Sequence, residues 1–189
     1  MKTAKNKPKS RERDDAMTST EIQAYGTVIK RPIALKESVC LASVKTLNQV
    51  LADTMTIRDL YKKHHWQTAG PAFYSLHLLF DKHYGEQAML VDELAERIQQ
   101  LGGVSLAMAA DVAEMTELER PPRGREAPGI QVSRLLAAHE RLIDTIRTGA
   151  QQSAASGDDG TNDLLVSGTL KANEMQVWFL SAHLEMPSA

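Results

Sequence analysis

The sequence predicts an all-α protein, a bundle of four long helices in which one long crossover connects the second helix to the third. Large apolar residues recur at close to helical spacing through four segments of the 189-residue chain. Clusters of glycine, proline and aspartate separate these segments, as breakers of helical structure do. No plausible pair of strands, internal repeat or glycine-rich phosphate loop is present in the sequence.

The first two helices end at short breaker sequences. The first is expected from about residue 34 to residue 67, and Gly70-Pro71 ends it because a proline biases the preceding residue away from helical geometry. The second is expected over about residues 72–101, and it stops at Gly102-Gly103 because glycine commonly follows the C-terminus of a helix. The backbone preferences of glycine and proline therefore set both boundaries.

A long connection, residues 104–129, joins the second helix to the third. Its first half (SLAMAADVAEM) predicts a short helix, and its second half (ERPPRGREAPG) predicts an irregular segment. The third helix is expected over about residues 130–155, and the fourth over about residues 162–185, after the turn SGDDGTND. Four long helices with one long crossover between the second and the third describe a ferritin-like bundle.

The charge of the chain is distributed unevenly along it. The whole chain carries a net charge of −2, but residues 1–13 hold six bases and one acid, a net charge of +5, so the remaining residues carry −7 (16 bases and 23 acids). Residues 1–20 contain no large apolar residue apart from two methionines and cannot build a core. We therefore expect a disordered basic arm over residues 1–20 and one helical domain over residues 21–189.

Composition also excludes several classes of protein. No stretch approaches the roughly 20 apolar residues that a membrane-spanning helix needs, and the lysine-rich start lacks the apolar core of a signal peptide. The single cysteine, Cys40, excludes an internal disulfide and a cysteine-based zinc site. A reducing, cytoplasmic setting without membrane contact is expected.

The second helix carries a stripe of ionisable residues. His77 and Asp81 are four residues apart, and so are Asp92 and Glu96. At 100° per residue, the last three lie about 40°, 60° and 100° from His77, so all four share one face of the helix. Such a stripe is most often a solvated surface. Small and apolar residues on the same stripe, which would let another helix approach closely, argue against that interpretation here: Tyr74, Leu78, Gly85, Ala88 and Ala95.

The spacing along this helix predicts a site that two subunits share. Asp81 and Asp92 lie roughly 16 Å apart on a straight helix, and one metal ion cannot bridge them with ligand bonds of about 2 Å. If two copies pack antiparallel about a two-fold axis near residues 86–87, each His77/Asp81 pair faces the Asp92/Glu96 pair of the partner. His65, near the end of the first helix, is a candidate second imidazole. Imidazole and carboxylate ligands together suit iron, manganese or zinc.

Residues 62–103 closely resemble the Dps proteins, the bacterial mini-ferritins. The matching elements are His65-Trp66, Gly70 with Phe73, the LHxxFD run that ends at Asp81, the DExAER run from Asp92, and the closing Leu101-Gly102-Gly103. The resemblance extends more loosely over about residues 35–185, including GDDGTNDLL, and does not cover the arm.

The resemblance implies an enzyme and an iron store in one particle. Dps proteins are hollow dodecamers that bind Fe(II), oxidise it between subunits, preferentially with hydrogen peroxide, and store the ferric product, which protects DNA. The iron ligands of the family fall on His65, His77 and Asp81 of one subunit and on Asp92 and Glu96 of its two-fold partner. The helix geometry requires the same pairing of subunits. Zinc is a possible substitute for iron at this site.

Several aromatic residues have two interpretations. The motif places the ligand directly before Trp66, which favours His65 over the adjacent His64. Trp66 itself is either a packing residue or, as the resemblance implies, a residue close to the iron that is oxidised in place of DNA. The remaining histidines have no carboxylate partner in a motif and are expected to be surface or packing residues: His83, His139 and His183.

Three aspartates, Asp158, Asp159 and Asp163, lie at the start of the fourth helix. Acidic residues favour the positive end of a helix, which accounts for one or two of them. The resemblance implies a second role, because this junction lines a three-fold channel through which iron reaches the cavity, and acids there would concentrate Fe(II). Asp163 is the first candidate for this role. Arg97 is a candidate partner for a nearby acid that would hold the ligand helix in position.

The basic arm predicts DNA binding without sequence preference, because lysine and arginine make phosphate contacts and twelve copies of the arm would add their weak contacts. Glu12, Asp14, Asp15 and the acidic body oppose it. The candidate contacts are Lys2, Lys5, Lys7, Lys9, Arg11 and Arg13.

Two alternative functions remain. The first is a nucleoid-associated protein that compacts DNA and whose metal site is structural or incidental. The second is a classical ferritin, which completes its site within one chain through an ExxH pair, and it is disfavoured because Tyr74 stands where that glutamate would precede His77.

Overall fold

The protein is all-helical over residues 21–185, the part of the chain that the computed structural model describes. Its elements are α1 (Glu37–Gln67), α2 (Phe73–Gln100), α3 (Ala109–Met115), α4 (Pro128–Ser156), α5 (Asp159–Asp163), the π-helical segment η1 (Leu164–Leu170) and α6 (Lys171–Ser181). The predicted disordered arm, residues 1–20, lies outside the described residues. Within residues 21–185, no helix is both long enough and apolar enough to cross a membrane.

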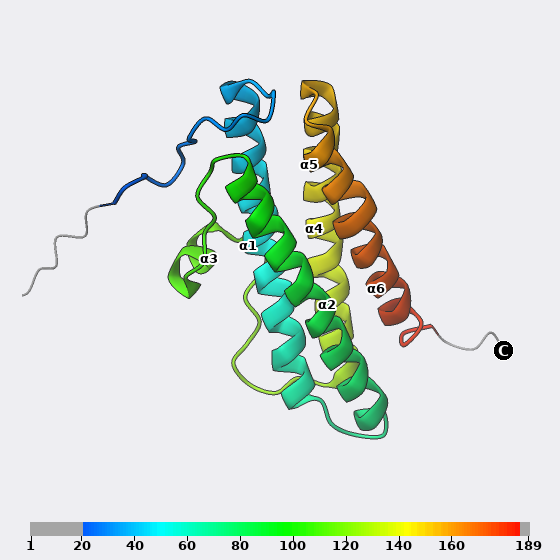
Figure 1. The fold of residues 1–189 in the computed structure, drawn as a ribbon. Coiled ribbons are helices and arrows are strands. Elements are labelled where there is room, and N and C mark those ends of the chain that lie inside the picture. The colour runs from blue at the N-terminus through cyan, green and yellow to red at the C-terminus, as the bar shows by residue number, and fades with distance from the viewer. Residues whose placement is uncertain (1–20, 186–189) are drawn as a thin grey trace, which may run out of the picture.

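The helices form the predicted four-helix bundle (Figure 1). α2 runs antiparallel to α1 and parallel to α4, while α5, η1 and α6 together form a fourth helix that runs back down the bundle. The crossover between α2 and α4 descends one side of the bundle and carries the short helix α3 away from the core. The four long helices bury one apolar core, whose largest members include Leu47, Leu51, Phe80, Leu94, Leu135, Leu142, Ile146 and Leu165. The ferritin-like arrangement is thereby confirmed.

Two predicted helix starts were wrong for identifiable reasons. α1 begins at Glu37 instead of residue 34, because Ala34 has a φ of 59° and cannot continue a right-handed helix. The fourth helix begins at Asp159 instead of residue 162, because the Asp158 side chain caps it by accepting a hydrogen bond from the Thr161 amide. It ends at Ser181 instead of about residue 185, and it contains the π-helical segment η1, which no residue pattern in the sequence predicted.

Residues 21–36 form an irregular segment that is tied to the end of α2. The Ile29 amide and the Gln23 side-chain amide both donate to the Gly102 carbonyl, at 2.8 and 2.9 Å. Gly102 itself has a φ of 83°, and a Cβ atom at this position would lie 1.9 Å from the Ile29 carbonyl oxygen. Glycine at the end of α2 therefore does more than stop the helix, because it also admits the backbone of this N-terminal segment.

Candidate metal centre

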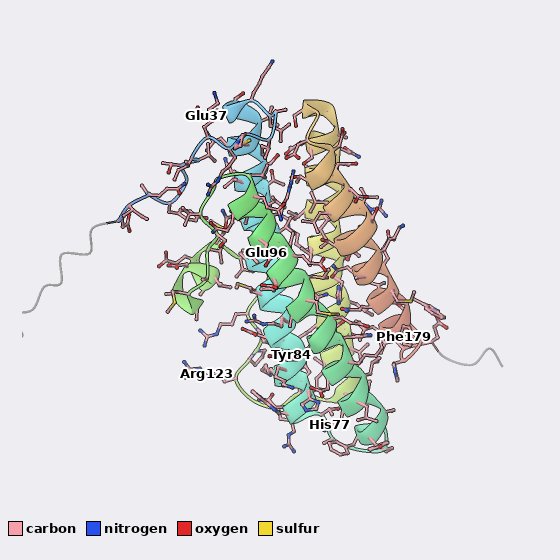
Figure 2. All side chains as sticks on the ribbon, viewed as in Figure 1. Glu37, His77, Tyr84, Glu96, Arg123 and Phe179 are labelled. Carbon is pink, nitrogen blue, oxygen red and sulfur yellow. The ribbon has the colours of Figure 1, made fainter. Side chains whose placement is uncertain are left out.

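The five predicted ligands lie on two neighbouring helices. His65 is near the C-terminal end of α1, His77 and Asp81 are in the first half of α2, and Asp92 and Glu96 are in its second half. His77 and Glu96 are well separated along α2 (Figure 2). The structure brings the first three side chains together and leaves the last two apart from them.

His65 and His77 form a stacked pair with a defined tautomer. Their ring centroids are 3.7 Å apart, with an angle of 19° between the planes. The Nδ1 atom of His65 lies 2.7 Å from the His77 carbonyl oxygen, and the Nδ1 atom of His77 lies 2.9 Å from the His65 carbonyl oxygen. A carbonyl oxygen only accepts, so both Nδ1 atoms must donate. In the neutral form of each ring the proton is therefore on Nδ1, and Nε2 is the atom that can bind a metal ion.

Asp81 lies beside the histidine pair and already has a cationic partner. Its Oδ1 atom is 4.0 Å from the Nε2 atom of His65 and 2.5 Å from the Nζ atom of Lys62. The hydrogen bond from Lys62 lowers the pKa of the Asp81 carboxyl below its ordinary value. Sequence reasoning missed Lys62, although its position three residues before His65 places both on one face of α1.

Asp92 and Glu96 are exposed on α2 and make no ion pair or hydrogen bond with any described side chain. Throughout residues 21–185 of a single chain, no group of three or more histidine, cysteine, aspartate or glutamate side chains is arranged to hold a metal ion. The two groups of predicted ligands therefore lie apart on the single chain, at the two halves of α2.

The exposed face of α2 is more apolar than a solvated surface would be. Tyr74 is 72% exposed, Leu78 49% and Met89 61%, and no atom lies within 4 Å of the position that a Cβ would take at Gly85. Trp66, at the end of α1, is also 69% exposed and is therefore not a core residue in the single chain. A face of this composition fits contact with a second helix better than contact with water.

The neighbouring histidines are packing residues, as the sequence suggested for two of them. His64 is fully buried against the core, and burial lowers its pKa to about 4, whereas His65 faces His77. This difference favours His65 over His64 as the ligand. His83 and His139 are fully buried in the bundle, and His183 lies in the exposed turn after α6.

The three aspartates at the start of the fourth helix have different surroundings. Asp158 is fully buried, and its carboxylate accepts from Ser43 Oγ at 2.6 Å, from Arg97 Nη2 at 2.6 Å and from the Thr161 amide at 3.1 Å. The channel role suggested for Asp158 does not fit this arrangement, because its oxygens are already engaged within the chain. Asp159 and Asp163 are exposed. The suggested partnership of Arg97 with an acid is confirmed.

Known proteins share both the sequence and the fold. The family model of the ferritin-like domain matches residues 44–188. An uncharacterised protein of the bpoA2 5′ region in Kitasatospora aureofaciens is 49% identical over 140 residues, which cover 74% of this chain and 93% of that protein. A nutrient stress-induced DNA-binding protein of Nostoc sp. is 36% identical over 159 residues, covering 84% and 86% of the two chains.

The structural comparison agrees with the sequence comparison. The solved structure of DpsC from Streptomyces coelicolor superimposes with a TM-score of 0.88 at 49% identity, and the match covers 90% of this chain and 99% of that one. Similarity of this extent over nearly the whole of both chains reflects common ancestry as well as a common fold.

Proposed function

The chain belongs to the Dps family of ferritin-like proteins, and we propose that it binds Fe(II), oxidises it, preferentially with hydrogen peroxide, at sites between two subunits, and stores the ferric product. His65, His77 and Asp81 of one subunit and Asp92 and Glu96 of its two-fold partner hold the iron, and zinc competes for the same ligands. A hollow dodecamer built from such dimers provides the storage cavity.

One observation carries this proposal, namely the geometry of the histidine pair. Both Nδ1 atoms face backbone carbonyls, which leaves the two Nε2 atoms for a metal ion, and the Nε2 atom of His65 lies 4.0 Å from the Asp81 carboxylate. Two imidazoles and carboxylates are a ligand set that suits Fe(II). Two Fe(II) ions give one electron each to hydrogen peroxide, and cleavage of its O–O bond yields two hydroxides, so this complete two-electron reduction releases no hydroxyl radical near DNA.

Peroxide-driven iron oxidation tests the function directly. Fe(II) is added anaerobically to the full-length protein, peroxide follows, and the ferric absorbance and the size of the iron-loaded particle are recorded. We expect oxidation to be much faster than in protein-free buffer, and the iron to elute with the protein as one large particle. Oxidation at the rate of buffer alone, or precipitation of the iron outside the particle, would contradict the proposal.

Lys62 is expected to compete with iron for Asp81. Its ammonium group must leave the Asp81 carboxylate before a metal ion binds there. Replacing Lys62 with Met should therefore tighten Fe(II) binding, by no more than about fivefold, because a partly exposed ion pair contributes little. Anaerobic titration calorimetry with Fe(II) measures this effect. Lys63→Met is the matched control, because Lys63 bonds Gln67 and the Gly124 carbonyl instead; weaker binding by Lys62→Met would refute the idea.

We also propose that Asp159 and Asp163 guide Fe(II) towards the cavity. Both carboxylates are exposed at the start of the fourth helix, and the Asp163 carboxylate accepts a hydrogen bond from Ser167 Oγ at 2.7 Å. If the family's three-fold channel forms here, these acids raise the local concentration of cations at its mouth.

Binding to DNA is a second proposed function, and it fits the name of the Nostoc relative. The candidate contacts are the six bases of residues 1–13, and all of them lie outside the described residues. A chain lacking residues 1–13 should lose its DNA mobility shift at low salt, whereas the full chain should shift DNA of any sequence and release it as salt rises. Unchanged shifts after the deletion would disprove this role. Such binding implies a cytoplasmic, nucleoid-associated protein.

If iron oxidation is absent but DNA compaction persists, the protein is the nucleoid-associated alternative with an incidental metal site. Loss of the five metal ligands would then leave compaction unchanged.

A further inference from the structure

A chain of hydrogen bonds crosses the bundle core next to the candidate metal centre. Tyr61 on α1, His83 on α2, His139 on α4 and Asn173 on α6 are all completely buried. The Tyr61 hydroxyl lies 2.6 Å from His139 Nε2 and 3.2 Å from His83 Nδ1, and His139 Nδ1 lies 2.9 Å from Asn173 Oδ1. Each of the four long helices therefore contributes one member to this polar network inside an otherwise apolar core.

The donors and acceptors between Asn173, His139 and Tyr61 follow from the partners of each group. The Asn173 amide nitrogen donates to the Thr169 carbonyl at 2.7 Å, so Asn173 Oδ1 is an acceptor, and His139 Nδ1 must donate to it. Burial lowers the pKa of His139 to about 3, so its ring is neutral and Nε2 has a lone pair. The Tyr61 hydroxyl consequently donates to His139 Nε2.

This arrangement pairs a phenol with a base in a site that water does not reach. Burial raises the pKa of Tyr61 well above its ordinary value, so the side chain stays a neutral phenol. Removing one electron from a phenol makes its O–H group strongly acidic. A base already hydrogen-bonded at 2.6 Å can take that proton with little movement. The surroundings of Tyr61 therefore favour the loss of an electron together with a proton.

The network is also close to the candidate metal centre. Tyr61 precedes His65 by one turn of α1, a rise of roughly 6 Å. Its ring centroid lies 6.1 Å from that of Phe80, the residue before Asp81. By contrast, Trp66 is largely exposed, and its side chain makes no hydrogen bond to a base within residues 21–185. Tyr61 is thus the oxidisable side chain near this site that is both shielded and paired with a base.

We propose that Tyr61 is a redox-active residue that reduces one-electron oxidants formed at the iron site, with His139 as its proton acceptor. This inference rests on the proposed function, because the oxidant is a hydroxyl radical from incomplete reduction of peroxide by Fe(II). The radical takes one electron from Tyr61 and becomes hydroxide. The O–H bond of Tyr61 breaks, an N–H bond forms at His139 Nε2, and a neutral tyrosyl radical remains.

The tyrosine is then regenerated by the substrate itself. A further Fe(II) ion gives one electron to the tyrosyl radical and becomes Fe(III), while the proton returns from His139 Nε2 to the phenol oxygen. Asn173 Oδ1 accepts from His139 in both states and stabilises the transient imidazolium ring. One oxidising equivalent that would otherwise reach DNA is thereby consumed in the oxidation of Fe(II) to Fe(III).

Freeze-quench electron paramagnetic resonance on the full-length protein tests the proposal. Samples are frozen after peroxide is added to the Fe(II)-loaded protein, and ring-deuterated tyrosine identifies any tyrosyl signal. Tyr61→Phe should lose this signal, while the combined variant Tyr25→Phe, Tyr74→Phe and Tyr84→Phe, whose one remaining tyrosine is Tyr61, should keep it. His139→Gln should also lose it, because an amide is too weak a base.

The outcomes separate this proposal from the proposed function. Rapid Fe(II) oxidation with a tyrosyl signal that depends on Tyr61 supports both. Rapid oxidation without a tyrosyl signal, or with one that persists in Tyr61→Phe, overturns the role of Tyr61 and leaves the iron chemistry intact. If the wild-type protein does not oxidise Fe(II) faster than buffer, the proposed function itself is contradicted. If His139→Gln does not assemble, the comparison of Tyr61→Phe with the triple variant still decides.

Discussion

A chain carrying both Asp92→Asn and Glu96→Gln is expected to oxidise Fe(II) with peroxide at least about 100-fold more slowly than the wild type. Loss of a residue that only hydrogen-bonds to a metal ligand lowers activity by up to about 100-fold, and loss of two ligands should lower it at least as much. The two carboxylates supply anionic oxygens that Fe(III) prefers, and the amides that replace them are neutral. Both side chains are exposed and bond no described side chain, so the change should alter the free energy of unfolding by no more than about 0.5 kcal/mol.

Stopped-flow absorbance of the ferric product measures the loss, with Glu93→Gln as the matched control. Glu93 is an exposed acid on the same helix but lies outside the ligand stripe. Its replacement should leave the rate unchanged. A double variant that oxidises iron at the wild-type rate would refute the assignment of both ligands.

Mixing two inactive variants tests whether two subunits share each site. One variant lacks His65, His77 and Asp81, and the other lacks Asp92 and Glu96. In a mixed dimer, one site lacks all five ligands and the other has all five. Random pairing makes about half of the dimers mixed, so about a quarter of all sites should be restored. No restoration would occur if one chain supplied all five ligands. Recovered activity therefore supports the antiparallel dimer independently of any single substitution.

Replacing Asp158 with Ala is expected to destabilise the fold by about 3 kcal/mol or more, as breaking a buried ion pair does. The substitution removes the partner of Arg97, the hydrogen bond from Ser43 and the cap of α5. It also loosens the link between the fourth helix and the helix that carries Glu96. Thermal unfolding at fixed protein concentration measures the effect, because an oligomer's apparent stability depends on concentration.

Asp159→Ala is the matched control for Asp158→Ala, because Asp159 is exposed, makes no ion pair with a described residue and should tolerate replacement. Equal unfolding temperatures for the two variants would show that the buried contacts of Asp158 contribute nothing. The same two variants should rank in the opposite order in an assay of iron uptake, because Asp159→Ala should slow the uptake. Asp163→Ala should slow it as well.

The stabilisation by Asp158 should depend on pH in a defined direction. Burial alone raises the pKa of the Asp158 carboxyl, but the hydrogen bonds from Ser43, Thr161 and Arg97 outweigh it and hold the pKa below its ordinary value of 3.8. The contribution is therefore fully present above pH 3.8 and is lost as the pH falls through the lower pKa of the folded state. The difference between wild type and Asp158→Ala should narrow in this acidic range.

Most of the fold was predictable because its determinants are local. Apolar residues at helical spacing located α1, α2 and α4, and Gly102 and Gly157 end two of these helices with positive φ angles. The π-helical segment η1, which packs against α4 and α2, was not predictable, because no residue pattern in the sequence specifies it. The network of Tyr61, His83 and His139 was not predictable from the sequence either, since each of them alone has the pattern of an ordinary core residue.

The candidate site was also predictable only in part. Periodicity alone placed His77, Asp81, Asp92 and Glu96 on one face of α2 and predicted that two subunits share the site. Only the structure revealed that Lys62 binds Asp81, that both Nε2 atoms of the histidine pair are available, and that Asp158 is engaged inside the chain. Identical residue types, such as Asp158 and Asp159, differ in role because one is buried and the other is not.

The sequence by itself determined the all-α bundle and the shared face of the four α2 residues, and from these it predicted a site between two subunits. This was possible because a helix repeats every 3.6 residues and its geometry can be counted along the chain. The tertiary structure decided which atoms are available for chemistry. Those contacts join residues far apart in the sequence, such as Tyr61 with His139, 78 residues on, and Ser43 with Asp158, 115 residues on. Hydrogen bonding and burial at such pairs depend on how the helices pack together, and no local pattern encodes that packing.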